Sequence, residues 1–295
     1  MATVVASSPH QLVRRRNRSQ KRTRWVVAIA RHTVLVLASV IFAGPFLWMI
    51  LTGLKSAPAA AAYPPSILPQ HWYFSNFVKV FELAPFGRFY VNSIVTSGLS
   101  TIGQVITSAF GGYAFARLRF PGRNVLFVVL LGALLVPFQV VFVPLVQLLA
   151  TFHWLNSYQG LIIPNIPSIF GVFLFRQFFL SFPLELEDAA RVDGCGLVKR
   201  FVLVIAPLSK NVVGAVGILA FVYNFNNFFF QFVIVSTEKY MTVPLGLTLF
   251  QAQSGASSEF NLLMAASAIS VVPVLIIFVL FQKQIVRGVM LGGLK

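Results

Sequence analysis

Six long runs of apolar residues dominate this sequence, and segments rich in polar residues and prolines separate them. The runs cover residues 33–51, 89–110, 125–149, 158–180, 212–235 and 262–281. Each is close to or above the roughly 20 residues that an α-helix needs to cross about 30 Å of hydrocarbon. Because a backbone in lipid must satisfy its own hydrogen bonds, such runs indicate helices. The pattern therefore predicts an all-α integral membrane protein with six transmembrane helices.

Composition supports this class. Of the 295 residues 57% are hydrophobic and 10% are charged, and 31 of them are Phe. A soluble fold could not bury so many large apolar side chains, so the bilayer must supply much of the solvent. Cys195 is the single cysteine, which excludes an intrachain disulfide.

The basic residues are distributed unevenly along the chain. The net charge is +16, and 19 of the 23 Lys and Arg residues lie in the N-terminal tail, after the second and sixth runs, or around the fourth and fifth. The loops on the other side hold only Lys55, Lys79, Arg88 and Lys239. Positive charge collects on the cytoplasmic side of membrane proteins, so both termini are expected in the cytoplasm. The charge thus indicates topology rather than nucleic-acid binding.

The same distribution suggests how the chain is organised. Residues 1–24 are polar and Arg-rich, which predicts a disordered cytoplasmic tail. Residues 25–286 form one membrane domain of six helices, and residues 287–295 form a short cytoplasmic tail. Residues 74–81 predict a short amphipathic helix along the outer surface. Residues 236–260 form an external loop whose flexible tip contains Ser254, Gly255, Ala256 and Ser257.

Polar residues inside the runs are a second kind of signal, because an unsatisfied polar group is costly in hydrocarbon. Asn224, Asn227 and Gln231 are spaced three and four apart, which would place them on one face of a helix. Gln139 and Asn165 lie beside helix-breaking prolines. These amides either line a translocation path or join neighbouring helices, and the spacing leaves both readings open. The runs contain no Asp or Glu, which argues against a proton-driven carrier.

A close helix contact is predicted where the second run ends. Ser108, Gly112 and Ala116 recur at four-residue spacing, which places three small side chains on one helix face.

The segment 181–207 concentrates acidic residues between two apolar runs. It holds four of the seven carboxylates: Glu185, Glu187, Asp188 and Asp193. We expect Asp188 to begin a short helix with its acids in the first turn, where the helix dipole favours them. Gly194 would end that helix, and a second helix would run from Leu197 to about Ile205, before Pro207. With Ala189 and Ala190 exposed, this helix–turn–helix would suit close docking of a cytoplasmic partner.

This segment resembles the EAA motif of permease subunits of binding-protein-dependent ABC importers. That motif is EAA, three residues, Gly, nine residues, Ile, one residue and Leu-Pro, and here it reads Asp188-Ala189-Ala190, Gly194, Val204 and Ala206-Pro207. Residues 113–123, YAFARLRFPGR, are similar to the second cytoplasmic loop of maltose-type sugar permeases. Where the family usually has Trp-Asn-Glu or Trp-Asn-Asp, this chain has Phe225-Asn226-Asn227.

The resemblance implies a type I ABC importer permease of a prokaryotic plasma or inner membrane that imports a sugar or oligosaccharide. It implies a second permease, two ATPase subunits that use ATP and Mg²⁺, and an extracytoplasmic substrate-binding protein as partners, with no cofactor on this chain. Asp188, Ala189, Ala190, Asp193, Gly194 and Pro207 would couple the permease to the ATPase. The loop tip at 254–257 would contact the binding protein.

Three alternatives stay open. Import of another solute, such as glycerol-phosphate or a polyamine, would use the same architecture. A membrane-embedded enzyme would need a nucleophile–base pair or a metal site, and the sequence has no hydrolase, phosphate-loop or metal-binding motif. A structural membrane anchor would not require proline-broken helices with interior amides.

Overall fold

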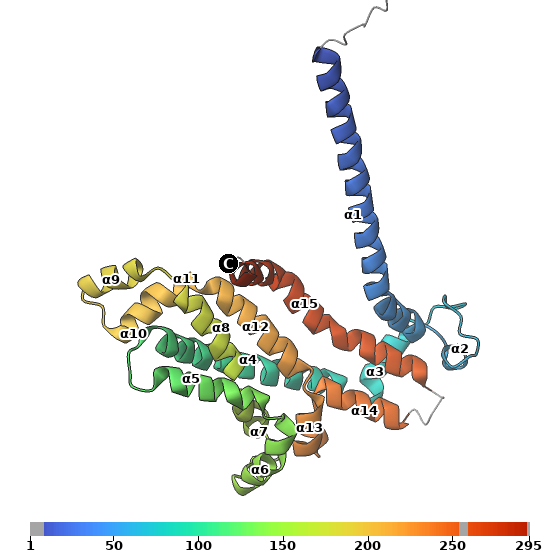
Figure 1. Cartoon of the computed structure of the whole chain (residues 1–295). Coiled ribbons are helices and arrows are strands. Elements are labelled where there is room, and N and C mark those ends of the chain that lie inside the picture. Colours follow the sequence, from blue (N-terminus) through green and yellow to red (C-terminus); the bar gives the residue numbers. More distant parts are fainter. Residues whose placement is uncertain (1–8, 254–258, 294–295) are drawn as a thin grey trace, which may run out of the picture.

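A computed structural model describes residues 9–253 and 259–293, and within these ranges the regular structure is helical, with no strand. Three helices are long: α1 (Pro9–Gly53), α4 (Phe86–Arg117) and α15 (Phe260–Gly293). The remaining segments of ten or more residues are α5 (Arg123–Gly132), α6 (Phe138–Thr151), α8 (Ile169–Leu180), α12 (Lys210–Phe225) and α14 (Val243–Gln253). Helices α8 and α12 pack along α4, and α1 packs on α15 (Figure 1).

Shorter helices connect these elements. Between α1 and α4 lie α2 (Ala57–Ala60) and α3 (Ser75–Leu83), the latter close to the amphipathic helix expected at 74–81. Four short segments flank the breaks in the membrane helices: η1 (Ala133–Leu135), α7 (Tyr158–Ile162), η2 (Ile163–Asn165) and α13 (Phe228–Ile234). The expected coupling segment contains α9 (Leu184–Val192), α10 (Leu197–Arg200), the π-helical η3 (Phe201–Ile205) and α11 (Ala206–Leu208), and η4 (Glu238–Tyr240) precedes α14.

Two helices in the described ranges are long and apolar enough to cross a membrane by themselves, at Val27–Gly53 and Phe260–Gln282. Three further pairs qualify only if each bent pair is one span: α5–η1 with α6 (94°), α7–η2 with α8 (40°), and α10–α11 with α12 (79°). This makes up to five spans. The predicted run 89–110 lies within α4, which has 32 residues but is not apolar enough to be counted. The fold is all-helical as predicted, while the number six is not confirmed.

Prolines account for two of the bends. Pro137 precedes α6 directly, and Pro164 and Pro167 lie where η2 gives way to α8. Proline lacks an N–H and its ring clashes with the preceding turn, so it favours a kink or a break in a helix. Broken helices of this kind persist at membrane depth only where other groups satisfy the backbone.

Polar side chains of α4 satisfy the backbone at the α7–α8 break. Ser100 Oγ donates to the carbonyl of Ile162 at 3.4 Å, and Gln104 Nε2 donates to that of Asn165 at 2.5 Å. Thr107 Oγ1 and Ser108 Oγ reach the carbonyls of Ile166 and Ser168 at 3.4 and 3.3 Å. The polar side chains that lower the hydropathy of α4 therefore form hydrogen bonds inside the protein, with carbonyls at the α7–α8 break.

The predicted small-residue contact is confirmed, and its partner is α8. A Cβ added at Gly112 would lie 2.5 Å from Phe175 Cβ and 2.8 Å from the backbone nitrogen of Arg176. Ser108 in turn contacts Gly171, where an added Cβ would lie 2.3 Å from Ser108 Oγ. Helices α4 and α8 thus pack almost backbone to backbone, as small residues allow in membranes.

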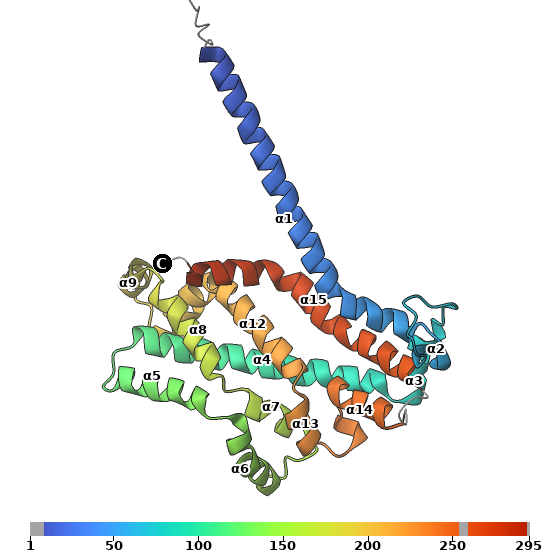
Figure 2. The ribbon, with the colours of Figure 1, turned by 45° about the vertical axis from the view of Figure 1, so that its right-hand side comes forward.

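Helix α1 extends away from the other helices over its N-terminal half, and its C-terminal end packs beside α15 (Figures 1 and 2). The contact is close, since a Cβ at Gly53 would lie 2.9 Å from the backbone of Ala265. The N-terminal segment 1–24, expected to be disordered, is helical from Pro9 onward, and residues 1–8 lie outside the described ranges. The C-terminal segment 287–295 continues α15 as far as Gly293.

A candidate coupling surface

Helix α9 begins at Leu184, directly after Pro183. We expected it to begin at Asp188, and that expectation was wrong: Pro183 occupies the N-cap position, where its missing N–H costs no helical hydrogen bond, and the helix begins directly after it. Asp188 therefore lies in the second turn, while Glu185 and Glu187 lie in the first. The acids nearest the N-terminal dipole are these two.

The predicted turn at Gly194 is confirmed, and its hydrogen bonds show why glycine is needed. The residue has φ +74°, a left-handed conformation that glycine adopts without steric cost. The Gly194 N–H donates to the Arg191 carbonyl at 3.1 Å, and the Cys195 N–H donates to the Ala190 carbonyl at 2.9 Å. These two bonds form a Schellman motif, which caps the carbonyls at the end of α9.

The second helical segment runs without a break from Leu197 to Leu208 through α10, η3 and α11, which confirms the predicted helix and extends it past Pro207. It ends at Ser209, whose Oγ donates to the Ile205 carbonyl at 2.6 Å. The chain then turns by 79° into α12. Pro207 thus lies just before this bend, where it deprives the preceding turn of a donor.

One side of α9 is exposed. Asp188, Ala189, Asp193 and Gly194 are open to solvent, and Val192 is 87% exposed. Asp188 forms a pair with Arg191 at 3.9 Å, in which both side chains are about two-thirds exposed. Exposed pairs of this kind contribute about 0–1 kcal/mol. The exposed side is therefore acidic and apolar, with groups that are free to contact another chain.

Ala190 does not belong to that side. It is 7% exposed and packs inward, so the expectation that both alanines are exposed was wrong. Helical geometry explains the difference, since Ala190 lies three residues after the buried Glu187 and shares its face, whereas Ala189 is turned away by about 100°.

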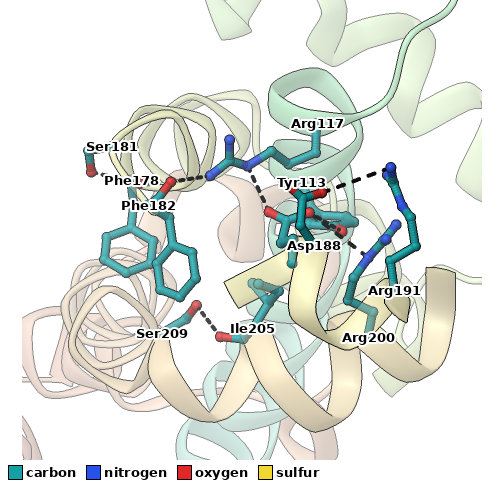
Figure 3. Close-up of polar contacts among 11 residues, drawn as sticks. Tyr113, Arg117, Phe178, Ser181, Phe182, Asp188, Arg191, Arg200, Ile205 and Ser209 are labelled. Carbon is teal, nitrogen blue, oxygen red and sulfur yellow. Dashed lines mark hydrogen bonds and ion pairs between the residues drawn. The ribbon is translucent and has the colours of Figure 1, made fainter. Parts of the chain in front are cut away.

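The role of Glu187 was not predicted from the sequence, and this carboxylate is only 6% exposed. Its Oε1 lies 2.9 Å from Arg117 Nε, and its Oε2 accepts a hydrogen bond from the Tyr113 hydroxyl at 3.0 Å. Arg200 Nε lies 3.9 Å from the same Oε2. We call these four residues the Glu187 cluster; in Figure 3 dashed lines run from Arg117 and from Arg200 to one site beside Tyr113. The signal in the sequence was that Glu187 lies three residues before Ala190, which places both on one face of the helix.

The candidate path residues are only partly brought together. Asn227 Nδ2 lies 3.4 Å from Asn165 Oδ1, and Asn224 Nδ2 lies 3.5 Å from Thr101 Oγ1. Gln231 is instead paired with Thr242 through a side-chain hydrogen bond. Gln139, at the start of α6, is exposed in this chain.

The expectation that Asn224, Asn227 and Gln231 share one helix face was wrong. Helix α12 ends at Phe225 and α13 begins at Phe228, so Asn227 is the residue that caps a new helix. Helical spacing does not carry across that break. Asn226 supports it by donating from Nδ2 to the Val222 carbonyl at 2.8 Å, a local side-chain bond of the sort that competes with helix continuation.

Two further points concern other candidate sites. The proposed binding-protein contact at Ser254, Gly255, Ala256 and Ser257 lies outside the described residues. Within the part of the chain that the structure describes, His, Cys, Asp and Glu form no group of three that could hold a metal ion.

Comparison with known proteins gives consistent matches over most of the chain. A family model described as "Binding-protein-dependent transport system inner membrane component" matches residues 108–291. The arabinooligosaccharides transport system permease protein AraQ of Bacillus subtilis (strain 168) is 32% identical over 92% of this chain and 96% of its own. The sn-glycerol-3-phosphate transport system permease protein UgpE of Yersinia enterocolitica serotype O:8 / biotype 1B is 30% identical over 87% and 94%.

Among solved structures, a crystal structure of a bacterial ABC transporter involved in the import of the acidic polysaccharide alginate contains a similar chain. The TM-score is 0.76 at 21% identity, with 89% of this chain and 97% of that chain covered. At this identity the likeness concerns the fold.

Proposed function

This chain belongs to the family of binding-protein-dependent transport system inner membrane components, and from that premise we propose that it imports a sugar or oligosaccharide. It is a permease subunit of an ABC importer and carries no catalytic site, since in this family a separate subunit hydrolyses ATP. The observation that carries the proposal is the match along nearly the whole length of AraQ, which covers 96% of that protein.

Six spans with both termini in the cytoplasm are the topology that we propose. The concentration of 19 of 23 basic residues in alternate segments supports it. Helix α4 would be the sixth span, although its mean hydropathy is too low for it to be identified as one. Its buried Ser100, Gln104 and Ser108 face other helices of the same chain, so its polarity does not need to meet lipid.

Coupling would take place at the exposed side of α9, seated in a cleft of the ATPase. Asp188 and Asp193 would pair with basic groups of that cleft, and Ala189 would allow close approach. Gly194 and Pro207 would fix the two turns that orient the helix, while Ala190 would pack α9 against the permease itself. Closure of the ATPase dimer on ATP would then move α9 and switch the permease between two states.

The translocation path would follow the uncharged amides. Asn224 is buried, and its Oδ1 accepts no hydrogen bond among the described residues, so it is an acceptor that a hydroxyl group would satisfy. Asn227, Asn165 and, at the exposed start of α6, Gln139 would extend this polar line. Gln231 would support this line without contacting the solute, because its side-chain oxygen accepts a hydrogen bond from the Thr242 hydroxyl.

A sugar is favoured over glycerol phosphate by the chemistry of this line. Its candidate members are amides, which exchange hydrogen bonds with hydroxyl groups and carry no charge to offset a phosphate. The likeness to glycerol-3-phosphate permeases keeps that solute as the second candidate. A phosphate ester would require cationic groups on the path, which a second permease subunit would have to provide.

The proposed assembly contains a second permease, two ATPase subunits with ATP and Mg²⁺, and an extracytoplasmic binding protein contacted by residues 254–257. Purification of this chain from its native membrane in mild detergent would identify the subunits. ATP hydrolysis is then measured with a panel of binding proteins, each loaded with one solute. Stimulation by a sugar-loaded protein is the expected result, and stimulation by a glycerol-phosphate-loaded protein alone would reject the sugar.

A further inference from the structure

Helix α9 is held to the body of the permease mainly by one carboxylate. Of its nine residues only Glu187 and Ala190 are buried, and Ala190 offers a single methyl group. The other two acids of the helix, Glu185 and Asp188, are exposed. The attachment of α9 is therefore polar, and Glu187 supplies it.

The partners of Glu187 come from two other elements. Arg117 is in the last turn of α4 and lies 2.9 Å from the carboxylate, while Tyr113, one turn earlier, donates to it at 3.0 Å. Arg200 approaches from the end of α10 at 3.9 Å. Figure 3 shows the side chains of Arg117 and Arg200 approaching one site beside Tyr113 from two directions. Glu187 thus links α9 to the C-terminal end of α4.

Arg117 strengthens this link by a second bond. Its Nη2 donates to the carbonyl of Phe182, the residue directly before Pro183. The guanidinium group of Arg117 therefore binds both the connecting segment that precedes α9 and the first turn of α9. Its fork of donors suits such double engagement better than a lysine ammonium would.

The charges in the Glu187 cluster are buried, and the positive charges outnumber the negative one. One carboxylate lies between two guanidinium groups, and the side chains of Arg117, Arg200 and Glu187 are each about 10% exposed or less. Removing the carboxylate would leave two buried cations close together without a counter-charge. The loss of one member of a buried ion pair is far more disruptive than the loss of an exposed one. The geometry thus makes α9 and the end of α4 difficult to move separately.

We propose that Glu187 is a positioning residue, which makes α9 move as one body with the C-terminal end of α4 through Arg117 and Tyr113. Motion of α9 then reaches α8 and α12, because both pack along α4. This inference rests on the proposed coupling function of α9. It differs from that proposal in that Glu187 faces the permease and not the ATPase.

The test is made on the assembled transporter in lipid vesicles, with three quantities measured: the ATPase bound per permease, ATP hydrolysis, and solute taken up per ATP. Glu187→Gln keeps the shape and removes the charge, and Glu185→Gln is the matched control on the exposed side of the same helix. We expect Glu187→Gln to retain the ATPase and hydrolysis while uptake per ATP falls about fivefold or more, the lower range of coupling between distant sites. Glu185→Gln should keep the wild-type ratio.

A second variant covers the case in which Glu187→Gln does not assemble. Tyr113→Phe removes one hydrogen bond to Glu187 and leaves the Arg117 pair, and it should lower uptake per ATP about two- to tenfold with assembly intact. Exchange of the charges, in Arg117→Glu with Glu187→Arg, should restore part of the ratio. A purely structural role predicts that uptake and hydrolysis fall together with the amount of protein.

The wild-type ratio in Glu187→Gln, or in Tyr113→Phe where the first variant fails to assemble, would overturn the positioning role and leave the proposed function intact. A wild-type transporter whose hydrolysis ignores every loaded binding protein would instead overturn the proposed function, and the role of Glu187 with it. The two failures are thus told apart by the wild-type control.

Discussion

The close packing of α4 on α8 leads to a sharp prediction for Gly112→Ala. The added Cβ would lie 2.5 Å from Phe175 Cβ and 2.8 Å from the Arg176 backbone nitrogen. Backbone cannot rotate away as a side chain can, so the two helices would have to separate. Gly98, on the same helix, is the control, because nothing lies within 4 Å of the Cβ that Gly98→Ala would add.

The magnitude follows from comparing the two variants. Both replace a mid-helix glycine with alanine, which by itself favours the helix by about 1 kcal/mol, and this contribution cancels in the difference. What remains is the overpacking cost, about 1–3 kcal/mol. At roughly 3 °C per kcal/mol for a chain above 150 residues, Gly112→Ala should unfold about 3–9 °C below Gly98→Ala.

The assay is thermal unfolding of the purified chain in one detergent at one scan rate, followed by circular dichroism. Equal scan rates are required because unfolding of membrane proteins is commonly irreversible. Equal midpoints for the two variants would refute the close contact between α4 and α8, and with it the rigid frame on which the proposed movement of α9 depends.

Two further variants test the other structural claims. Gly194→Val places a β-branched residue at φ +74°, which costs roughly 1–2 kcal/mol, so solute uptake per ATP should fall. The control is Gly196→Val, at φ −63° with nothing within 4 Å of the added Cβ, which should transport normally. Equal uptake per ATP in the two variants would contradict the role of the turn at Gly194. Gln104→Leu removes the donor to the Asn165 carbonyl and should cost about 1–3 kcal/mol in the same unfolding assay. Replacement of the exposed Gln147 by Leu should be neutral, and a neutral Gln104→Leu would exclude support of the α7–α8 break by α4.

Local signals in the sequence predicted local structure well. The acidic cluster, Gly194 and Pro207 located α9 and its turn, because the left-handed turn and the helix dipole depend on residues close together in the chain. The spacing of Ser108, Gly112 and Ala116 likewise predicted a close helix contact, since small residues on one face have that effect whichever helix approaches.

Two errors, over Glu187 and over α4, occurred where the outcome depended on residues distant in sequence, whereas the start of α9 and the break at Asn226–Asn227 are local features. Glu187 looks like one more solvated acid until Arg117, 70 residues earlier, meets it in the fold. The break at Asn226–Asn227 has no proline or glycine to announce it, so the helical spacing of Asn224 and Gln231 was misleading. The hydropathy of α4 is too low for a membrane span to be counted there, because its polar side chains form hydrogen bonds with the α7–α8 break, some 60 residues later in the chain.

Above all, we propose that this chain helps to import a sugar with energy from a partner ATPase. The most direct measurement is uptake of a labelled sugar into vesicles that contain the purified complex, with ATP supplied to the ATPase and the loaded binding protein on the opposite side. We predict saturable uptake that requires both ATP and the binding protein. Sugar uptake that proceeds without ATP, or uptake of a phosphate ester and of no sugar, would contradict it.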